Sequence, residues 1–270
     1  MTSATTLTSH DLADLARNIK DWGKALGFQA VAIADVDLKQ HEEHLQQWLA
    51  NHYHGEMDYM ARHGTKRSRP RELEPGTLRV ISARMDYLPP DTAITTTLNN
   101  PEAAYISRYA LGRDYHKMMR KRLARLAKKI EAAIGPFGYR AFVDSAPVLE
   151  KALGEKSGLG WIGKHTLLLH REAGSWFFLG ELFVDIPLPV DDAVTPHCGT
   201  CSACIDICPT QAIVAPYQLD SRKCISYLTI ELKNAIPEEL RQPMGNRVFG
   251  CDDCQIVCPW NRFAKTTLEE

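Results

Sequence analysis

Residues 198–209 read CGTCSACIDICP, and this stretch decides how the chain is organised. Its cysteines are separated by two, two and three residues, and a proline follows the last one. Bacterial ferredoxins bind [4Fe–4S] clusters with this spacing, and the fourth cysteine then ligates the other cluster of a pair. The stretch therefore predicts one half of a two-cluster binding region, with ligands at Cys198, Cys201, Cys204 and Cys208.

A second, looser run completes the pattern. Cys224 stands alone, and after 26 further residues CDDCQIVCP follows at 251–259. Exchanging the fourth cysteine between the runs assigns all eight cysteines of the chain. One cluster would take Cys198, Cys201, Cys204 and Cys258, and the other would take Cys208, Cys224, Cys251 and Cys254.

Zinc is the main alternative occupant of such a region, since structural zinc sites also use CxxC pairs. Three cysteines in tandem with a Cys-Pro ending favour clusters over separated zinc pairs. A purely structural role for the clusters stays open. Two clusters placed in tandem are, however, better suited to moving electrons.

Composition and charge set the remaining limits. The 270 residues are 44% hydrophobic and 24% charged, with a net charge of −1, so no global charge steers the chain to nucleic acid or membrane. No apolar run reaches the roughly 20 residues that span a bilayer, and the polar first ten residues lack an export signal. We expect a cytoplasmic protein whose thiols stay reduced.

The cysteines divide the chain, because none occurs before residue 198. Residues 1–187 alternate helical and strand-like patterns, which predicts an α/β (α+β) domain with a mixed sheet covered by helices. Residues 188–270 are expected to form the ferredoxin-like domain with two [4Fe–4S] clusters. The expected strands lie at 30–34, 79–87, 139–143, 166–170 and 176–184, and the expected helices at 9–26, 41–50, 116–134 and 148–157.

Two stretches of the first domain attract attention as a site. Residues 158–163 fit G-x-G-x-x-G, but a helical pattern precedes them and a strand follows, which is the reverse of a dinucleotide-binding turn. The better candidate is Asp144, at the end of a strand and followed by a glycine-rich loop that permits close approach to a flat ligand. A helix cap ahead of Pro147 is an equally good interpretation of Asp144.

Taken together, the chain resembles the epoxyqueuosine reductases, relatives of the reductive dehalogenases. The likeness rests on VDSAPVLEK at 143–151, GLGWIGKHTLLL at 158–169, GSWFFLGEL at 174–182 and both cysteine runs. It implies a base-off cob(II)alamin in the α/β domain and reduction of the epoxide of epoxyqueuosine, in the anticodon loop of tRNA, to queuosine. Asp144 matches the presumed proton donor of the family. The family lacks the D-x-H-x-x-G motif that supplies a histidine to cobalt, and here Met119 replaces the glycine after Asp114 and His116.

The resemblance also suggests which residues contact the cofactor. The first choice is the loop 157–165, since glycines allow backbone contact and a lysine can meet an amide or phosphate. The second choice is segment 105–109 with Asp114, Tyr115 and His116, for which a buried aromatic cluster is an equally good explanation. The expected contacts are Arg67, Tyr105, Ser107, Tyr109, Asp144, Ser157, Gly158, Gly163, Lys164 and His165.

Partners follow from the same likeness. Electrons would come from an external flavodoxin or ferredoxin type of donor, and we expect a monomer without membrane contact. Basic residues in an expected loop at 62–71 and on helix 116–134 are candidates for phosphate contact, although a solvated face explains such a helix more often. The family pattern continues into a C-terminal helical-repeat segment that helps to hold tRNA, and this chain ends twelve residues after Cys258 without it.

Two other functions remain to be compared. A ferredoxin-like electron-transfer protein, whose α/β domain only docks a partner enzyme, would bind no corrin. A reductive dehalogenase would share corrin and clusters but act on organohalides. The absence of an export signal and the basic patches argue against the latter.

Overall fold

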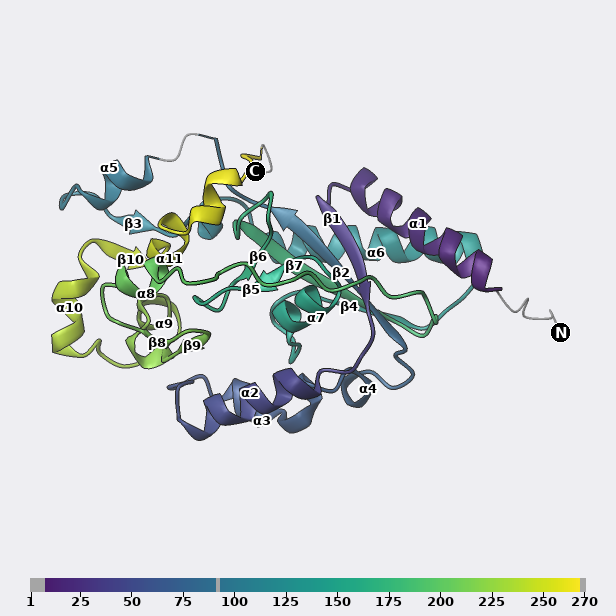
Figure 1. The fold of residues 1–270 in the computed structure, drawn as a ribbon, viewed down its shortest axis with the longest axis horizontal. Helices are drawn as coiled ribbons and strands as arrows, with labels where there is room; N and C mark the ends of the chain where they lie inside the picture. Colours follow the sequence, from purple (N-terminus) through teal and green to yellow (C-terminus); the bar gives the residue numbers. More distant parts are fainter. Residues whose placement is uncertain (1–7, 91–92, 268–270) are drawn as a thin grey trace.

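A computed structural model describes residues 8–90 and 93–267. Figure 1 shows a sheet with its helices on one side of the molecule and the cysteine-bearing segments gathered on the other. The predicted α/β architecture, followed by a smaller cysteine-rich region, is confirmed.

The central sheet has four strands in the order β1-β2-β7-β4, and every neighbouring pair is antiparallel. Because side chains alternate along a strand, Ile81 and Leu182 point to one face while Val80 and Phe183 point to the other. The sequence predicted a mixed sheet, whereas all four strands of this sheet pair antiparallel; parallel pairing occurs in a separate two-stranded sheet, described below. The four strands are β1 (Ala30–Ala34), β2 (Arg79–Asp86), β7 (Phe177–Val184) and β4 (Tyr139–Phe142).

Helices cover both faces of the sheet. Helices α1 (Ser9–Ala25) and α6 (Tyr115–Ile134) bury their apolar stripes in the larger core on one face. The predicted cap at Thr8 is present as a capping box with Asp11. The shorter helix α7 (Glu150–Lys156) packs on the opposite face, against Phe183. In Figure 1 the cysteine region lies to the left of this helix, beyond the end of the sheet.

The basic stretch at 62–71 is not the loop that the sequence suggested. It forms short helical turns after α2 (Lys39–Ala50), and several of its cations bind within the fold. Arg67 is buried and donates to the Tyr59 carbonyl, and Arg69 pairs with Glu42. The turns are α3 (Tyr59–Arg62), η1 (Gly64–Arg67) and α4 (Pro70–Leu73).

Between the second and seventh strands the chain forms mostly short elements. The strand expected at 166–170 is only two residues long, because it pairs with an equally short strand at the glycine-rich loop. These elements are α5 (Ile94–Leu98), β3 (Tyr105–Ile106), η2 (Arg108–Ala110), β5 (Trp161–Ile162) and β6 (Leu168–Leu169).

The cysteine region is built from turns and very short helices, and it is joined to the first domain by strand pairing. Strand β10 (Arg247–Phe249) runs parallel to β3. This pairing connects segments 142 residues apart in sequence, from Tyr105 to Arg247. The other elements are α8 (Ala203–Asp206), β8 (Ile213–Ala215), β9 (Gln218–Leu219), η3 (Ser221–Lys223), α9 (Ile225–Ile230), α10 (Glu238–Met244), α11 (Asp253–Ile256) and η4 (Pro259–Phe263).

Candidate functional site

The two cysteine runs fold into matching turns. Ser202 precedes α8 with φ −119° and ψ 3°, and Asp252 precedes α11 with φ −120° and ψ 4°. In the first turn the backbone N–H of Ile205 donates to the Ser202 carbonyl, and in the second that of Gln255 donates to the Asp252 carbonyl, both at 2.8 Å. Equal spacing therefore produces equal local structure in both runs.

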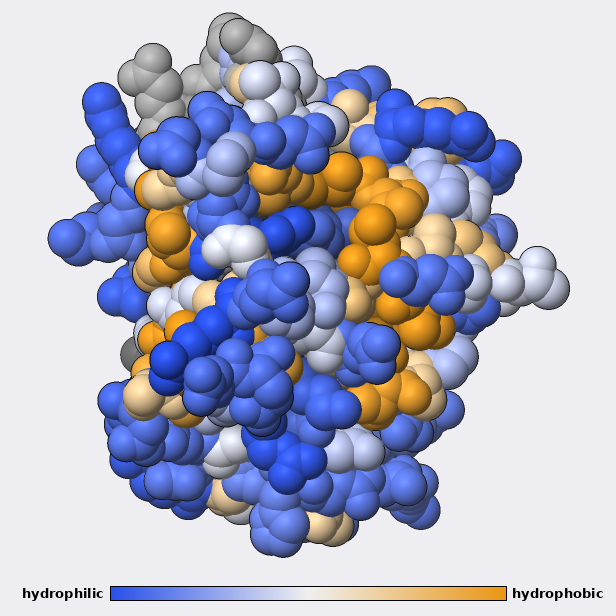
Figure 2. Space-filling model, turned by 90° about the vertical axis from the view of Figure 1, so that its left-hand side faces the viewer, coloured by the Kyte–Doolittle hydropathy of each residue, from blue (hydrophilic) through white to orange (hydrophobic). Residues whose placement is uncertain are grey.

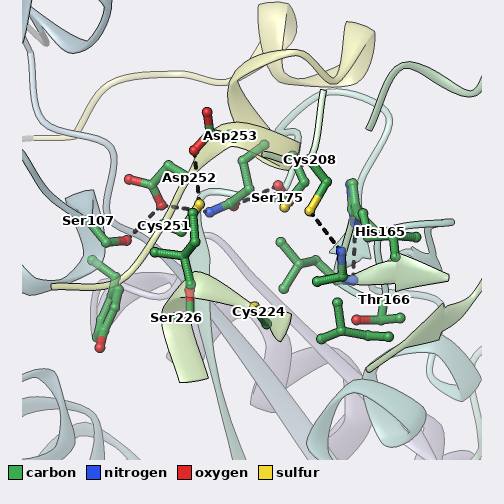
Figure 3. Close-up of a pocket in the computed structure, with 18 of the residues that line it drawn as sticks. Ser107, His165, Thr166, Ser175, Cys208, Cys224, Ser226, Cys251, Asp252 and Asp253 are labelled. Carbon is green, nitrogen blue, oxygen red and sulfur yellow. Dashed lines mark hydrogen bonds between the residues drawn. The ribbon is translucent and has the colours of Figure 1, made fainter. Parts of the chain in front are cut away.

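Two cavities separate the eight cysteines into two sets. The larger cavity, about 390 Å³, is lined by Cys208, Cys224, Cys251 and Cys254, and Figure 3 shows three of these labelled around it. The smaller cavity, about 230 Å³, is lined by Cys198, Cys201, Cys204 and Cys258. These are the two sets obtained by exchanging the fourth cysteine between the runs.

The cysteine side chains suit a group larger than one metal ion. Within residues 8–90 and 93–267, no three His, Cys, Asp or Glu side chains converge on a single-ion site. Zinc would require four ligand atoms about 2.3 Å from one centre. Burial, helped by neighbouring thiols, raises the pKa of Cys204 to about 11, and the positive charge of a bound metal centre would stabilise its thiolate.

Lys164 and Asp252 hold the two cysteine loops. Lys164 Nζ donates to the carbonyls of Gly199 and Cys201 at 2.7 and 2.8 Å, so it braces the first loop and lines the smaller cavity only. Asp252 is fully buried and accepts hydrogen bonds from Tyr105 Oη, Ser107 Oγ and the Arg108 backbone N–H at 2.7–2.8 Å.

Asp252 is a residue that sequence reasoning missed. Desolvation, followed by the charge of Asp252, raises the pKa of Tyr105 well above its usual range, so the phenol stays a donor. Tyr105 has no exposed surface and does not line either cavity. Its place is beneath the second cysteine loop rather than at an open cofactor surface. In the sequence, the one sign of a role for Asp252 was its position as an acidic residue between Cys251 and Cys254.

An aromatic wall adjoins the second set of cysteines. Tyr115 stacks on Phe178 with ring centroids 3.8 Å apart, and Tyr87 lies 4.5 Å from Phe178. These rings and Tyr109 line both the larger cysteine cavity and a neighbouring cavity of about 690 Å³. The wall therefore has one cavity with thiols and another without them.

His165 is the one first-choice residue that lines the larger cavity. It also lines the smaller cavity, and its Nε2 is buried with no hydrogen-bond partner among the described residues. Desolvation, followed by the charge of Lys151, lowers the pKa of His165 to about 4, so the ring stays neutral. Ser107 and Tyr109, from the second choice, line the same larger cavity.

The other predicted contacts lie elsewhere. Ser157 is buried and donates to the Gly154 carbonyl, and Gly163 packs against Leu169 and His165. A Cβ on Gly158 would lie 2.2 Å from the Asp192 carbonyl oxygen. The close approach that this glycine allows is therefore to the segment leading into the cysteine region, not to an open cavity. Arg67, buried under the Tyr59 carbonyl, lines none of the cavities described here.

Asp144 stands behind the aromatic wall on a tight turn. Its φ is +54°, and the Ser145 N–H donates back to the Val143 carbonyl at 2.6 Å, which is a strained conformation for a residue with a side chain. Helix α7 begins six residues later with Leu149 as its cap, so Asp144 is not a helix cap. Tyr115 Oη donates to its Oδ2 at 2.9 Å, and His116 Nε2 lies 3.0 Å from the same oxygen.

Contact with Asp144 shifts the pKa values of His116 and Tyr115. Desolvation lowers the pKa of His116, but its hydrogen bonds to Asp144 and Asp114 outweigh this effect and the net shift is upward. Burial and the Asp144 charge raise the pKa of Tyr115 far above its usual range. The His116 imidazole and the neutral Tyr115 phenol thus both contact one oxygen of the Asp144 carboxyl group, beside the aromatic wall.

Comparison with known proteins identifies this arrangement. Residues 67–145 match the family model described as "Epoxyqueuosine reductase QueG, DUF1730", and residues 197–261 match a 4Fe-4S double cluster binding domain. An epoxyqueuosine reductase from Pseudomonas aeruginosa is 71% identical over 98% of this chain and 73% of its own length. The chain belongs to the epoxyqueuosine reductase family. The resemblance seen in the sequence is thereby confirmed, and the chain is an iron–sulfur oxidoreductase with two [4Fe–4S] clusters.

Solved structures agree with this membership. An epoxyqueuosine reductase solved with an epoxyqueuosine-modified tRNA-Tyr stem loop has a TM-score of 0.84 at 28% identity, over 97% of this chain and 68% of that one. A Bacillus subtilis epoxyqueuosine reductase, with its catalytic loop swung out of the active site, has a TM-score of 0.85 at 27% identity over the same shares. A B12-dependent reductive dehalogenase matches at 18% identity with a TM-score of 0.60, over 100% of this chain and 34% of its own, which shows a shared fold.

The family assignment favours neither of the alternatives raised by the sequence. Neither the carrier nor the dehalogenase is supported by the close relatives, which are named as epoxyqueuosine reductases. One of the solved relatives holds a tRNA stem loop modified with epoxyqueuosine. In the part of the chain that the structure describes, no helix is long and apolar enough to cross a membrane.

Proposed function

We propose that this chain reduces the epoxide of tRNA-bound epoxyqueuosine at the aromatic wall, with Asp144 as the proton donor. One observation carries the proposal: Tyr115 lines the same cavity as the second cysteine set, and its phenol donates a hydrogen bond to Asp144. The Tyr115 side chain thus connects the proposed proton donor, Asp144, with the cavity of the second cysteine set.

The residues at the wall suit a base-off cobalamin. Flat rings of Tyr109, Tyr115 and Phe178 offer apolar surface to a corrin. His165 Nε2, which has no hydrogen-bond partner among the described residues, offers a polar atom at the neighbouring cysteine cavity. A bound corrin would supply the electrons or the nucleophile needed to open the epoxide, and bound clusters would supply electrons to it. His116 is held by the carboxylates of Asp114 and Asp144.

The protein side chains control the proton. Removing the epoxide oxygen as water takes two electrons and two protons. Asp144, linked to the aromatic wall through Tyr115, would pass a proton to that oxygen. His116 connects it to Asp114, whose side chain is 47% exposed. A raised His116 pKa keeps a proton available at this position near neutral pH.

A face of α6 suits contact with tRNA phosphates. Arg120, Lys121, Arg125, Lys128 and Lys129 are exposed on this helix, whereas Arg122 is turned inward to the Gly27 carbonyl. Exposed cations of this kind bind backbone phosphates and position the RNA without reading its sequence. Choice of the base would then depend on the cavity at the aromatic wall, into which the modified base is extruded.

Electron supply and location complete the proposal. Figure 2 shows apolar surface gathered on the side of the molecule that faces the viewer. In the cysteine region, the side chains of Ile207, Val214 and Tyr217 are exposed. Such a face suits a small flavodoxin or ferredoxin type of donor, which delivers electrons one at a time through the two clusters. We place the reaction in the cytoplasm, where tRNA and reduced thiols occur together, and infer that the chain acts as a monomer of two domains, 1–187 and 188–270.

The test uses anaerobically purified chain with cobalamin, a chemical reductant and epoxyqueuosine-containing tRNA. Replacing Asp144 with Ala should lower turnover by about 10²–10⁴-fold while iron content and the cobalamin absorption spectrum stay unchanged. The control is Asp21→Ala, an exposed aspartate on α1 that should keep full activity. Full activity of the Asp144 variant would remove it from the mechanism. About eight irons with no corrin bound would instead leave only an electron-transfer module.

A further inference from the structure

A second carboxyl group holds the Asp144 turn from behind. Glu150, the first residue of α7, accepts the backbone N–H of Asp144 on its Oε1 at 2.6 Å. This is the only hydrogen bond from the described residues to that N–H, and it fixes a backbone with φ of +54°. A residue with a side chain keeps such a conformation only where its surroundings enforce it. Glu150 therefore bears directly on where the Asp144 carboxyl points.

A third carboxyl group lies beneath Glu150. Glu181 is on β7 with no exposed surface, and its neighbours across the sheet are Ser82 and Phe142. Among the described residues, no N–H or hydroxyl group donates to either of its oxygens. The polar group beside it is the carboxyl of Glu150. A buried carboxyl group without a donor is costly, and a proton shared with the neighbouring carboxyl removes that cost.

The surrounding charges do not neutralise this pair. Four neighbouring groups act electrostatically on Glu150. They are Asp144 in the turn, Tyr115 on α6, Arg67 in η1 and Lys151 on α7. Lys151 directs its Nζ to the Thr166 carbonyl at 2.8 Å, and Arg67 directs Nη2 to the Tyr59 carbonyl at 2.9 Å. Among the described residues neither cation forms an ion pair with Glu150 or Glu181, so two ionised carboxylates would face each other without a directly paired cation.

We propose that Glu150 and Glu181 share one proton and together form a latch that positions Asp144, with Glu150 as the part that grips the Asp144 backbone. The latch rests on the proposed role of Asp144 as proton donor. Neither glutamate lines the cavities at the aromatic wall, so both are positioning residues that act through Asp144. Burial raises the pKa of both glutamates, which agrees with a retained proton.

Amide hydrogen exchange of the chain, measured without substrate, tests the latch directly. Glu150→Leu removes the acceptor, and the Asp144 amide should then exchange about tenfold faster or more. Glu150→Gln keeps an acceptor oxygen and should stay within about threefold of the wild-type protein. The matched control is Glu155→Leu on the same helix, since Glu155 accepts the Ile162 backbone N–H at 2.7 Å. It should speed exchange at Ile162 and leave Asp144 unchanged.

Activity and pH supply the remaining readouts. With tRNA substrate, Glu150→Leu should lower kcat about tenfold or more with KM within about twofold, and Glu150→Gln should restore kcat. In Glu181→Gln, the amide donates to Glu150 at every pH. In the wild-type protein, we expect the Asp144 amide to lose protection from exchange when the glutamate pair deprotonates at rising pH. This loss should be absent from the Glu181→Gln variant.

Two results would overturn the latch: unchanged Asp144 exchange in Glu150→Leu, or the same pH dependence in Glu181→Gln and the wild-type protein. The exchange measurements need no turnover. Failure of the wild-type protein to reduce epoxyqueuosine would reject the proposed function, and the latch would still be decided separately.

Discussion

The cysteine region and the Asp144 turn hold their functional side chains in different ways. In the cysteine region, each CxxC forms its own short helical turn, and the two turns at Ser202 and Asp252 have nearly identical backbone angles. Asp144 has no such local frame. Its position depends on Tyr115 and His116 from α6 and on Glu150 from α7.

The difference shows what local sequence spacing can and cannot arrange. Thiols at fixed spacing adopt the same turn wherever the pattern occurs, so their grouping survives a 26-residue interruption after Cys224. A single carboxyl group gains its chemistry from partners that are 28 to 29 residues away in sequence. The cysteine region should therefore respond to loss of a ligand, and the Asp144 turn to loss of packing or hydrogen bonds.

The largest effect expected is on the second cysteine set. Cys224→Ser should reduce the iron content from about eight to about four per chain, because one cluster loses a ligand while the other keeps all four. Cys258→Ser should lose the cluster of the other set and retain a similar count. Iron analysis and electron paramagnetic resonance measure both. Retention of all iron in Cys224→Ser would break the assignment of cysteines to two separate sets.

Asp252 tests whether the cysteine region depends only on local turns. Asp252→Ala leaves Tyr105, Ser107 and Arg108 with buried donors that lack their acceptor, which should cost about 3 kcal/mol or more of unfolding free energy. Ser202→Ala, the matching position of the first run, should cost far less, since Ser202 Oγ bonds only the exposed Asp206. Thermal unfolding of both variants compares them. Equal losses would mean that the link to the first domain contributes little.

Gly158 tests the passage between the two regions. Gly158→Ala should destabilise the chain by about 2 kcal/mol or more, because φ is +82° and the added Cβ meets the Asp192 carbonyl. Gly76→Ala is the matched control, with φ of +88° and open space around the Cβ, and it should cost about 1 kcal/mol. Chemical unfolding of both variants separates strain from collision. A Gly158 variant no worse than Gly76→Ala would rule out the close contact.

The smallest effect expected is a pH dependence at the Asp144 turn. The pKa of His116 is raised in the folded chain, so its stabilisation is complete below about 6.5 and lost as pH rises through the higher folded value. His116→Gln should therefore lower Tm more at pH 6 than at pH 9. Because the side chain is 34% exposed, we expect less than about 1 kcal/mol. A larger loss at pH 9 would contradict the sign.

Sequence reasoning was strongest where the pattern is periodic or local. The strands at 30–34 and 79–87 and the helix at 116–134 agree with β1, β2 and α6 to within one residue at each end. It was weakest at the cofactor contacts. Ser157, Gly158 and Lys164 resembled a ligand loop, but they bind the α7 backbone, the incoming linker and the first cysteine loop. A glycine-rich sequence shows that something passes closely, without showing whether it is a ligand or the chain itself.

The sequence by itself determined the two [4Fe–4S] clusters, the α/β domain that precedes them and the family, because cysteine spacing and residue periodicity act over a few residues. Only the tertiary structure decided that Tyr115 and His116 meet at one oxygen of Asp144 and that Glu150 and Glu181 meet beneath it. The physical reason is that polar contacts between side chains of α6, α7 and β7 depend on how those elements pack on the sheet. No local pattern in any one of them records that packing.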